Sequence, residues 1–211
     1  MNKSILIADD HEIVRVGIKT LISDNLAVKK IDEAGTQTEI IQHVKANFYD
    51  LVLLDINIPG CDFIKLMDWL KVTSPGTAVL VFTMHTEDVY GKRCMQIGAK
   101  GFLHKTASNN EIIAAINKVL EGKKYINAHL KEILGQSKKE TSAGNPVSKL
   151  SARELEIALL IHKEVSLPEI CTILNIQYST ANTYKRRIFE KLNVHNTLSL
   201  SRLLETCKVE G

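Results

Sequence analysis

The sequence lacks long hydrophobic runs and closely spaced cysteines. No apolar stretch approaches the roughly 20 residues that a membrane-spanning helix needs, which argues against an integral membrane protein. The four cysteines lie far apart: Cys61, Cys94, Cys171 and Cys207. Without C-x-x-C spacing they indicate neither a zinc site nor a disulfide framework. Residues 1–4 lead directly into a strand-like run without signal-peptide features, so we expect a cytoplasmic protein that does not associate with membranes.

Charge is distributed unevenly along the chain. Residues 1–122 contain 13 Lys and Arg against 15 Asp and Glu, a net charge of −2. Residues 123–211 contain 14 against 9, a net charge of +5. The C-terminal part therefore favours a polyanionic partner, although a basic surface by itself is weak support for nucleic-acid binding.

The first half alternates short apolar runs with amphipathic stretches. Strands are predicted over residues 5–8, 28–31, 51–54, 79–82 and 101–103. Helices are predicted over residues 11–23, 37–47, 61–72, 87–97 and 109–121. The third and fourth strands are apolar at every position, which is typical of strands covered on both faces. Five successive strand–helix units predict a doubly wound α/β domain with a five-stranded parallel sheet.

The second half has a different pattern. A short helix is predicted over residues 127–134, and the polar, turn-rich residues 135–146 are typical of a linker. After the linker, four helices are predicted over residues 152–162, 167–174, 179–192 and 197–207, with Ser179 as the cap of the third. We divide the chain into a domain over residues 1–122, a linker with a short helix over residues 123–148, and an all-α domain over residues 149–211.

Polar residues follow four of the predicted strands. Asp9 and Asp10 follow the first strand, Asp55 the third, Thr83 the fourth and Lys105 the fifth. The carboxyl ends of parallel strands meet at one edge of a sheet, where ligands bind. Three neighbouring carboxylates repel one another unless a cation joins them, and Mg²⁺ prefers such oxygen ligands. A carboxylate beside Mg²⁺ can attack a phosphoryl donor while an ammonium neutralises the transferred oxygens.

Each of these residues alone has a simpler explanation, as a helix cap, a loop residue or a solvated lysine. Their combination indicates a functional site. The segments that carry them are ILIADDHEIVRVGI, LVLLDINIPG, VLVFTMH and GAKGFLHK. Together, over residues 4–121, they resemble the receiver domain of two-component response regulators, which has a flavodoxin-like fold.

The resemblance implies a role for each matching residue. Asp55 would be the phosphoacceptor, Thr83 would hydrogen-bond the phosphoryl group, and Lys105 would form its ion pair. Phe102 would be the aromatic residue that changes rotamer with Thr83. The implied Mg²⁺ ligands are the carboxylates of Asp9, Asp10 and Asp55 and the backbone carbonyl of Asn57.

Three positions depart from the receiver pattern. Phe63 stands where a glycine is usual, Met84 replaces the small residue that usually follows the threonine, and Thr106 replaces a frequent proline. None of these changes removes a reactive group. Since Met84 is next to the phosphoryl site, we expect it to slow the access of small phosphodonors and hydrolytic water.

Residues 180–192 predict a basic amphipathic helix. Four residues recur at helical spacing and predict a buried stripe: Ala181, Tyr184, Ile188 and Leu192. Five others are left on the remaining faces: Asn182, Thr183, Lys185, Arg186 and Arg187. Asparagine can pair with adenine and arginine with guanine, while lysine and arginine also neutralise phosphates. On charge alone, a solvated basic helix face is the simpler interpretation.

A second resemblance favours DNA binding. The segments LSARELEIALLI and SLPEICTILNIQYSTANTYKRRIFEKLNV, within residues 150–204, resemble the four-helix helix-turn-helix domain of NarL/FixJ-type, LuxR-like regulators. The resemblance implies these base-facing residues: Asn182, Thr183 and Arg186. It implies these phosphate contacts: Ser179, Lys185, Arg187 and Lys191. The family often has Val-Lys-x-His where this chain has Ala181-Asn182-Thr183-Tyr184, so a target site cannot be transferred from relatives.

We interpret the chain as a response regulator, a transcription factor rather than an enzyme. A sensor histidine kinase would phosphorylate Asp55 with Mg²⁺, and a homodimer, at least when phosphorylated, would bind two half-sites of double-stranded DNA. One alternative is a phosphorylation-independent DNA-binding regulator whose receiver is a scaffold. Another is an Mg²⁺-dependent phosphatase with an aspartyl nucleophile, which would usually have a second Asp at the position of Asn57.

Overall fold

A computed structural model of the chain describes residues 3–136, 146–174 and 176–207. The chain forms two compact units, residues 1–136 and residues 137–211, and each unit is described by itself below. Residues 137–145 of the predicted linker lie outside the described residues.

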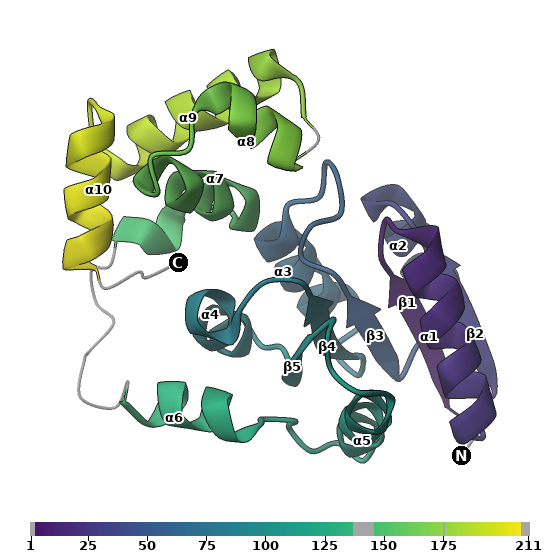
Figure 1. Cartoon of the computed structure of the whole chain (residues 1–211). Helices are drawn as coiled ribbons and strands as arrows, with labels where there is room; N and C mark the ends of the chain where they lie inside the picture. The colour runs from purple at the N-terminus through teal and green to yellow at the C-terminus, as the bar shows by residue number, and fades with distance from the viewer. Residues whose placement is uncertain (1–2, 137–145, 175, 208–211) are drawn as a thin grey trace. The chain divides into compact units, whose positions relative to one another are not determined.

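The first unit is built on a parallel sheet of five strands in the order β2-β1-β3-β4-β5 (Figure 1). The strands are β1 (Ser4–Ala8), β2 (Lys30–Ala34), β3 (Leu51–Leu54), β4 (Ala78–Thr83) and β5 (Gly101–His104). The first four helices are α1 (Glu12–Asn25), α2 (Gln37–Ala46), α3 (Phe63–Thr73) and α4 (Lys92–Gln96). They are followed by α5 (Asn109–Leu120) and α6 (Ala128–Gln136). The predicted doubly wound domain is confirmed.

Both faces of the sheet are buried. Ile7 and Leu53 pack with Ile22 of α1 and Ile116 of α5 in one hydrophobic cluster. Leu6 alternates with these residues along β1 and is itself fully buried on the opposite face, because successive strand residues point to opposite sides. The continuous apolar runs of the central strands are explained by this double coverage, and each such side chain contributes about 1.5–3 kcal/mol on burial.

The strand order positions the functional site. From β1 the chain runs outward to β2, then crosses back to β3 on the other side of β1, so the order reverses between β1 and β3. Ala8 and Leu54 are paired at the carboxyl ends of these two strands. Asp9 and Asp55 come directly after this pair, where ligands bind in open parallel sheets.

The second strand differs from its prediction. It covers Lys30–Ala34 and pairs with β1 from Ser4↔Lys30 to Ala8↔Ala34, whereas residues 28–31 were expected. The ladder includes Asp32 and Glu33 because β2 is an edge strand, whose polar side chains remain partly exposed. Asp32 accepts a hydrogen bond from the Tyr49 hydroxyl, which gives this carboxylate a local partner.

The helix predicted over residues 87–97 begins instead as a π-helix, η1 (Glu87–Gly91), which continues into α4. The predicted helix after residue 127 is confirmed as α6, and it packs on η1. Asn127 Nδ2 donates to Glu87 Oε1 at 2.6 Å. Leu130 lies so close to Gly91 that a Cβ on that glycine would meet Leu130 Cδ1 at 2.7 Å. A residue larger than glycine at position 91 would therefore require the Leu130 side chain to shift.

The second unit is helical, as predicted. It contains the 3₁₀ turn η3 (Pro146–Lys149), α7 (Ala152–His162), α8 (Leu167–Leu174), α9 (Tyr178–Leu192) and α10 (Thr197–Thr206). Ser151 and Glu154 form a capping box at α7. The prediction of Ser179 as the α9 cap is wrong. The backbone N–H groups of Thr180 and Ala181 both donate to the Gln177 carbonyl, so the helix starts from Gln177.

Candidate functional site

Two buried carboxylates lie side by side at the carboxyl end of the sheet. The Asp9 amide donates to the Ala34 carbonyl at 3.0 Å, and the Asp55 amide donates to the Ala8 carbonyl at 2.9 Å. Each residue is thus held by the strand next to its own. Asp9 is 2% and Asp55 4% exposed.

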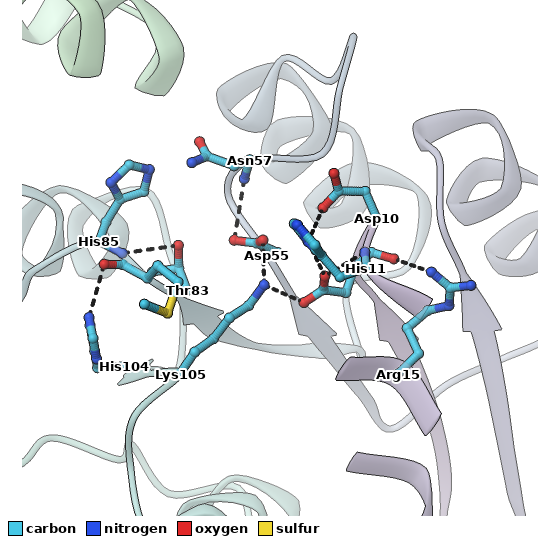
Figure 2. Close-up of polar contacts among 11 residues, drawn as sticks. Asp10, His11, Arg15, Asp55, Asn57, Thr83, His85, His104 and Lys105 are labelled. Atoms are coloured by element: carbon cyan, nitrogen blue, oxygen red, sulfur yellow. Dashed lines mark hydrogen bonds and ion pairs between the residues drawn. The ribbon is translucent and has the colours of Figure 1, made fainter. Parts of the chain in front are cut away.

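Lys105 joins the two carboxylates (Figure 2). Its Nζ lies 2.6 Å from Asp9 Oδ2 and 2.8 Å from Asp55 Oδ2, and its backbone amide donates to the Thr83 carbonyl at 2.8 Å. Burial alone lowers the pKa of this ammonium, but the charges and hydrogen bonds of Asp55 and Asp9 outweigh burial and raise the pKa. Lys105 therefore remains charged at neutral pH and fixed at the site.

Asp10 and His11 extend the cluster toward solvent. His11 Nδ1 lies 2.8 Å from Asp10 Oδ1 and 3.2 Å from Asp9 Oδ1, and the His11 amide donates to Asp9 Oδ1 at 2.9 Å. Arg15 donates to the Asp9 carbonyl at 2.7 Å. His11 was not among the expected site residues. Its position directly after two aspartates is the only sequence feature that indicated it.

The residues present fit a divalent cation. One ligand atom each from Asp9, Asp10, His11 and Asp55 lies within 4.8 Å of the others. Three carboxylates and one ammonium leave two formal negative charges, which a hard dication would balance. Asn57 lies at the same edge, where its amide donates to Asp55 Oδ1 at 3.3 Å. Among the described residues, its side-chain Oδ1 is buried without a hydrogen-bond partner.

Thr83 and Phe102 lie behind the carboxylates, inside the domain. Thr83 is fully buried, and its hydroxyl accepts a hydrogen bond from the His85 amide at 3.4 Å. Phe102 is also fully buried. It lies on β5 directly before Leu103, which pairs with Phe82 of β4. Met84, by contrast, is 61% exposed. The structure thus brings Asp9, Asp55 and Lys105 into direct contact, while the Thr83 hydroxyl is bonded to its own loop.

The predicted DNA-facing surface lies on α9. Ala181, Ile188 and Leu192 are buried as expected, and Tyr184 is half-buried. The predicted DNA contacts on the outer face are exposed or half-buried: Ser179, Asn182, Thr183, Lys185, Arg186 and Arg187. Several have contacts within the helix. The Thr183 hydroxyl donates to the Ser179 carbonyl at 2.8 Å, and the Lys185 ammonium lies 5.6 Å from the centre of the Phe189 ring.

Two family models match the chain, one for each unit. The model of the response regulator receiver domain matches residues 5–117, which include the carboxylate cluster and Lys105. The model of bacterial regulatory proteins of the luxR family matches residues 148–204, which include α9. The chain belongs to the LuxR-type response regulators.

Relatives and a solved structure support this assignment, and each match covers nearly the whole chain of this response regulator. Response regulator UvrY of Escherichia coli K12 is 33% identical over 95% of this chain and 92% of its own. Response regulator GacA of Pseudomonas aeruginosa is 32% identical over 94% of each chain. The structure of RcsB of Salmonella enterica serovar Typhimurium bound to promoter P1flhDC with phosphomimetic BeF₃⁻ is 25% identical, with a TM-score of 0.60. It covers 97% of this chain and 98% of that one.

Lys191 differs from the other predicted phosphate contacts of this response regulator. Its ammonium lies 2.6 Å from Oε2 of Glu154, which is 3% exposed, and the same oxygen accepts the Ser151 amide. Arg153, the neighbour of Glu154, donates to the Leu174 carbonyl at 2.8 Å. It thereby gives a hydrogen-bond partner to a carbonyl in the last turn of α8, which has none within the helix. Glu154 thus connects Lys191 to the cap of α7, and its neighbour Arg153 connects α7 to α8.

Tyr178 was also missed from the sequence. It is the first residue of α9 and is 57% exposed, on the turn preceding Asn182. The predicted start at residue 179 had placed it outside the helix.

Among the described residues of this regulator, no helix is long and apolar enough to cross a membrane.

Proposed function

We propose that a sensor histidine kinase phosphorylates Asp55 in an Mg²⁺-dependent reaction, and that the phosphoryl group controls homodimerisation and sequence-specific binding of double-stranded DNA through α9. The observation that carries this proposal is the Lys105 ammonium, 2.8 Å from Asp55 and 2.6 Å from Asp9. A buried cation held between carboxylates of two strands is the preorganised charge that phosphoryl transfer requires.

Asp55 acts as the nucleophile in the proposed reaction. Its carboxylate oxygen attacks the phosphorus of a phosphohistidine, and the new O–P bond forms as the P–N bond breaks. The leaving imidazole nitrogen keeps the electron pair of that bond and takes up a proton. A bound Mg²⁺, held by Asp9, Asp10, Asp55 and the Asn57 carbonyl, would neutralise charge on the reacting oxygens. Lys105 forms the ion pair with the phosphoryl group, since its raised pKa keeps it protonated.

Thr83 and Phe102 carry the change away from Asp55. In our proposal the Thr83 hydroxyl leaves the His85 amide and donates to the phosphoryl group, and Phe102 changes rotamer with it. The loop between β4 and η1 then moves. The charge of the phosphoryl group thus shifts this loop from one of two arrangements to the other. The exposed surface that changes would be the one that pairs in the homodimer.

On DNA, α9 enters the major groove. We assign Asn182, Thr183 and Arg186 to base edges. We assign phosphate contacts to Ser179, Lys185 and Arg187, which lie on or beside the exposed face of α9. For Lys191 we propose a change from the sequence-based expectation. It stays on Glu154, because its departure would leave the buried Glu154 carboxylate without its cation.

The phosphoacceptor is tested by labelling the full chain with a radioactive small phosphodonor and Mg²⁺. The wild-type protein and an Asp68→Asn control, which removes an exposed carboxylate on α3, should be labelled. Asp55→Asn should not be labelled. Persistent labelling of Asp55→Asn would move the acceptor to another residue.

A further inference from the structure

His104 connects the end of β5 to the loop that follows β4. Its Nε2 lies 2.9 Å from the carbonyl oxygen of Met84. Its Nδ1 lies 2.7 Å from the Thr106 hydroxyl and 3.3 Å from the Thr106 amide nitrogen. Figure 2 shows the ring extending from β5 toward the loop after Thr83. One side chain thus contacts both segments that flank the phosphoryl site.

These partners define the tautomer of His104. The Thr106 amide is only a donor, so Nδ1 must accept and carry no hydrogen. In the neutral ring the proton then lies on Nε2 and is donated to the Met84 carbonyl. Thr106 therefore orients the ring, and the ring holds Met84 with a directional hydrogen bond.

The held carbonyl belongs to the residue directly after Thr83. The Thr83 carbonyl is itself bound by the Lys105 amide at 2.8 Å, and the Thr83 hydroxyl accepts from the His85 amide at 3.4 Å. Residues 83–85 are thus held at three successive points by contacts among the described residues, and the bond to the Met84 carbonyl comes from the His104 side chain of β5. A displacement of Met84 must stretch or break that bond.

We infer that His104 is a positioning residue that sets how readily the receiver switches. Its Nε2–H stabilises the arrangement in which the Thr83 hydroxyl is bonded to the His85 amide, and phosphorylation of Asp55 has to overcome this bond. The inference rests on the proposed function. It adds a residue that the proposed function does not use, since the imidazole, Thr106 and the Met84 carbonyl act together.

Two substitutions separate the two nitrogens of the ring. His104→Asn retains a polar atom near the Nδ1 position, for Thr106, but does not reach Met84. His104→Gln is longer and retains an N–H donor near the Nε2 position. Hydrogen exchange of the 84–86 amides, measured on the full chain without phosphodonor, should be faster in His104→Asn than in the wild-type protein and restored toward wild type in His104→Gln. Equal exchange in all three proteins would overturn the inference.

The second readout is the affinity for beryllofluoride, a phosphoryl analogue, in the presence of Mg²⁺. Removal of one hydrogen bond from the unswitched arrangement should lower the Kd of His104→Asn about fivefold, with His104→Gln near wild type. A Kd unchanged in His104→Asn would overturn the inference. Thr106→Val, which loses the hydroxyl at nearly constant shape, should show a smaller effect in the same direction and serves if His104→Asn fails to fold.

The two readouts distinguish failure of this inference from failure of the proposed function. If the wild-type protein does not bind beryllofluoride but exchange responds to His104→Asn, the hydrogen bond holds the loop and the proposed phosphorylation of Asp55 is wrong. If beryllofluoride binds normally and neither readout responds to His104→Asn, the proposed function stands and the inference is wrong.

Discussion

Lys191 of α9 and Glu154 of α7 form an ion pair of 2.6 Å that joins two helices of the DNA-binding unit. Glu154 is almost fully buried and also accepts the Ser151 amide, so this carboxylate closes the cap of α7 and anchors the end of α9 at once. The contact therefore links the cap of α7 to the last turn of α9.

Lys191→Met should therefore lower stability. The substitution leaves the Glu154 carboxylate buried without its cation, and because the Lys191 side chain is partly exposed, the cost is about 1 to 3 kcal/mol. Chemical denaturation of the full chain, with a probe in the C-terminal unit, measures the loss. Unchanged stability together with weaker DNA binding would instead return Lys191 to the phosphate contacts.

Arg187→Met is the matched control for this pair. Arg187 is exposed on α9, so its loss should leave stability within about 0.5 kcal/mol of wild type. DNA affinity should fall for all sequences alike. The slope of the logarithm of affinity against the logarithm of salt concentration should become shallower by about one unit, because one phosphate contact is lost. The measurement is a DNA titration at several salt concentrations. An unchanged salt dependence would remove Arg187 from the interface.

Asn182→Ala should change sequence preference rather than affinity alone. If Asn182 pairs with a base, its loss should cost about 1 to 3 kcal/mol of discrimination at one position of each half-site. Selection from a random DNA pool, with wild type and variant in parallel, identifies that position. The same selected motif from both proteins would contradict the assignment of Asn182 to a base edge.

The fold and the carboxylate site were predictable because they depend on local patterns. Continuous apolar runs predicted the central strands, and parallel strands place Asp9, Asp55 and Lys105 at one edge whatever the connections between them. The boundary of β2 was not predictable in the same way. Its ladder continues through Asp32 and Glu33, since an edge strand tolerates polar side chains that apolar periodicity does not recognise.

Contacts between distant segments were also beyond sequence patterns. Lys191 and Glu154 are 37 positions apart, and nothing in the basic run of α9 indicated that one of its lysines pairs with a buried carboxylate of α7. The π-helical turn at Glu87–Gly91 lies against α6, whose Leu130 approaches Gly91, and this tertiary contact also has no sequence pattern. His104 was missed because its role depends on the position of a backbone carbonyl, which has no sequence signal.

Met84→Ala should shorten the lifetime of the phosphorylated receiver. The Met84 side chain is exposed next to Thr83, so its truncation should admit small phosphodonors and water more easily and speed both labelling and hydrolysis several-fold. The decay of label on the purified protein measures the second rate. Val72→Ala, an exposed truncation on α3, should have no effect. A decay no faster than wild type would refute the role of Met84.

Glu87→Gln should change the pH dependence of stability. Burial raises the pKa of Glu87 above its usual value of 4.5, although the hydrogen bond from Asn127 opposes the shift. A raised folded-state pKa means stability that is present below pH 4.5 and lost as pH rises through the folded pKa. Glu87→Gln should thus melt higher than wild type at pH 7, with the advantage disappearing near pH 4.

Glu121→Gln is the control, because the pKa of Glu121 is shifted in the opposite direction to that of Glu87. The hydrogen bond from the Lys123 ammonium lowers the pKa of this exposed carboxylate. Since such exposed pairs contribute little, we expect a small loss of stability at pH 7, if any, and no gain. Melting curves of both variants that change in parallel with pH would contradict the assignment of the effect to the buried Glu87.

The central claim is that the phosphoryl state of Asp55 controls DNA binding by α9. It is tested most directly by titrating a DNA site from the random-pool selection with wild type and Asp55→Asn, each with and without beryllofluoride and Mg²⁺. We predict that beryllofluoride tightens binding by the wild-type protein and leaves Asp55→Asn unchanged. Equal affinity in all four titrations would contradict the account and support a receiver that serves only as a scaffold.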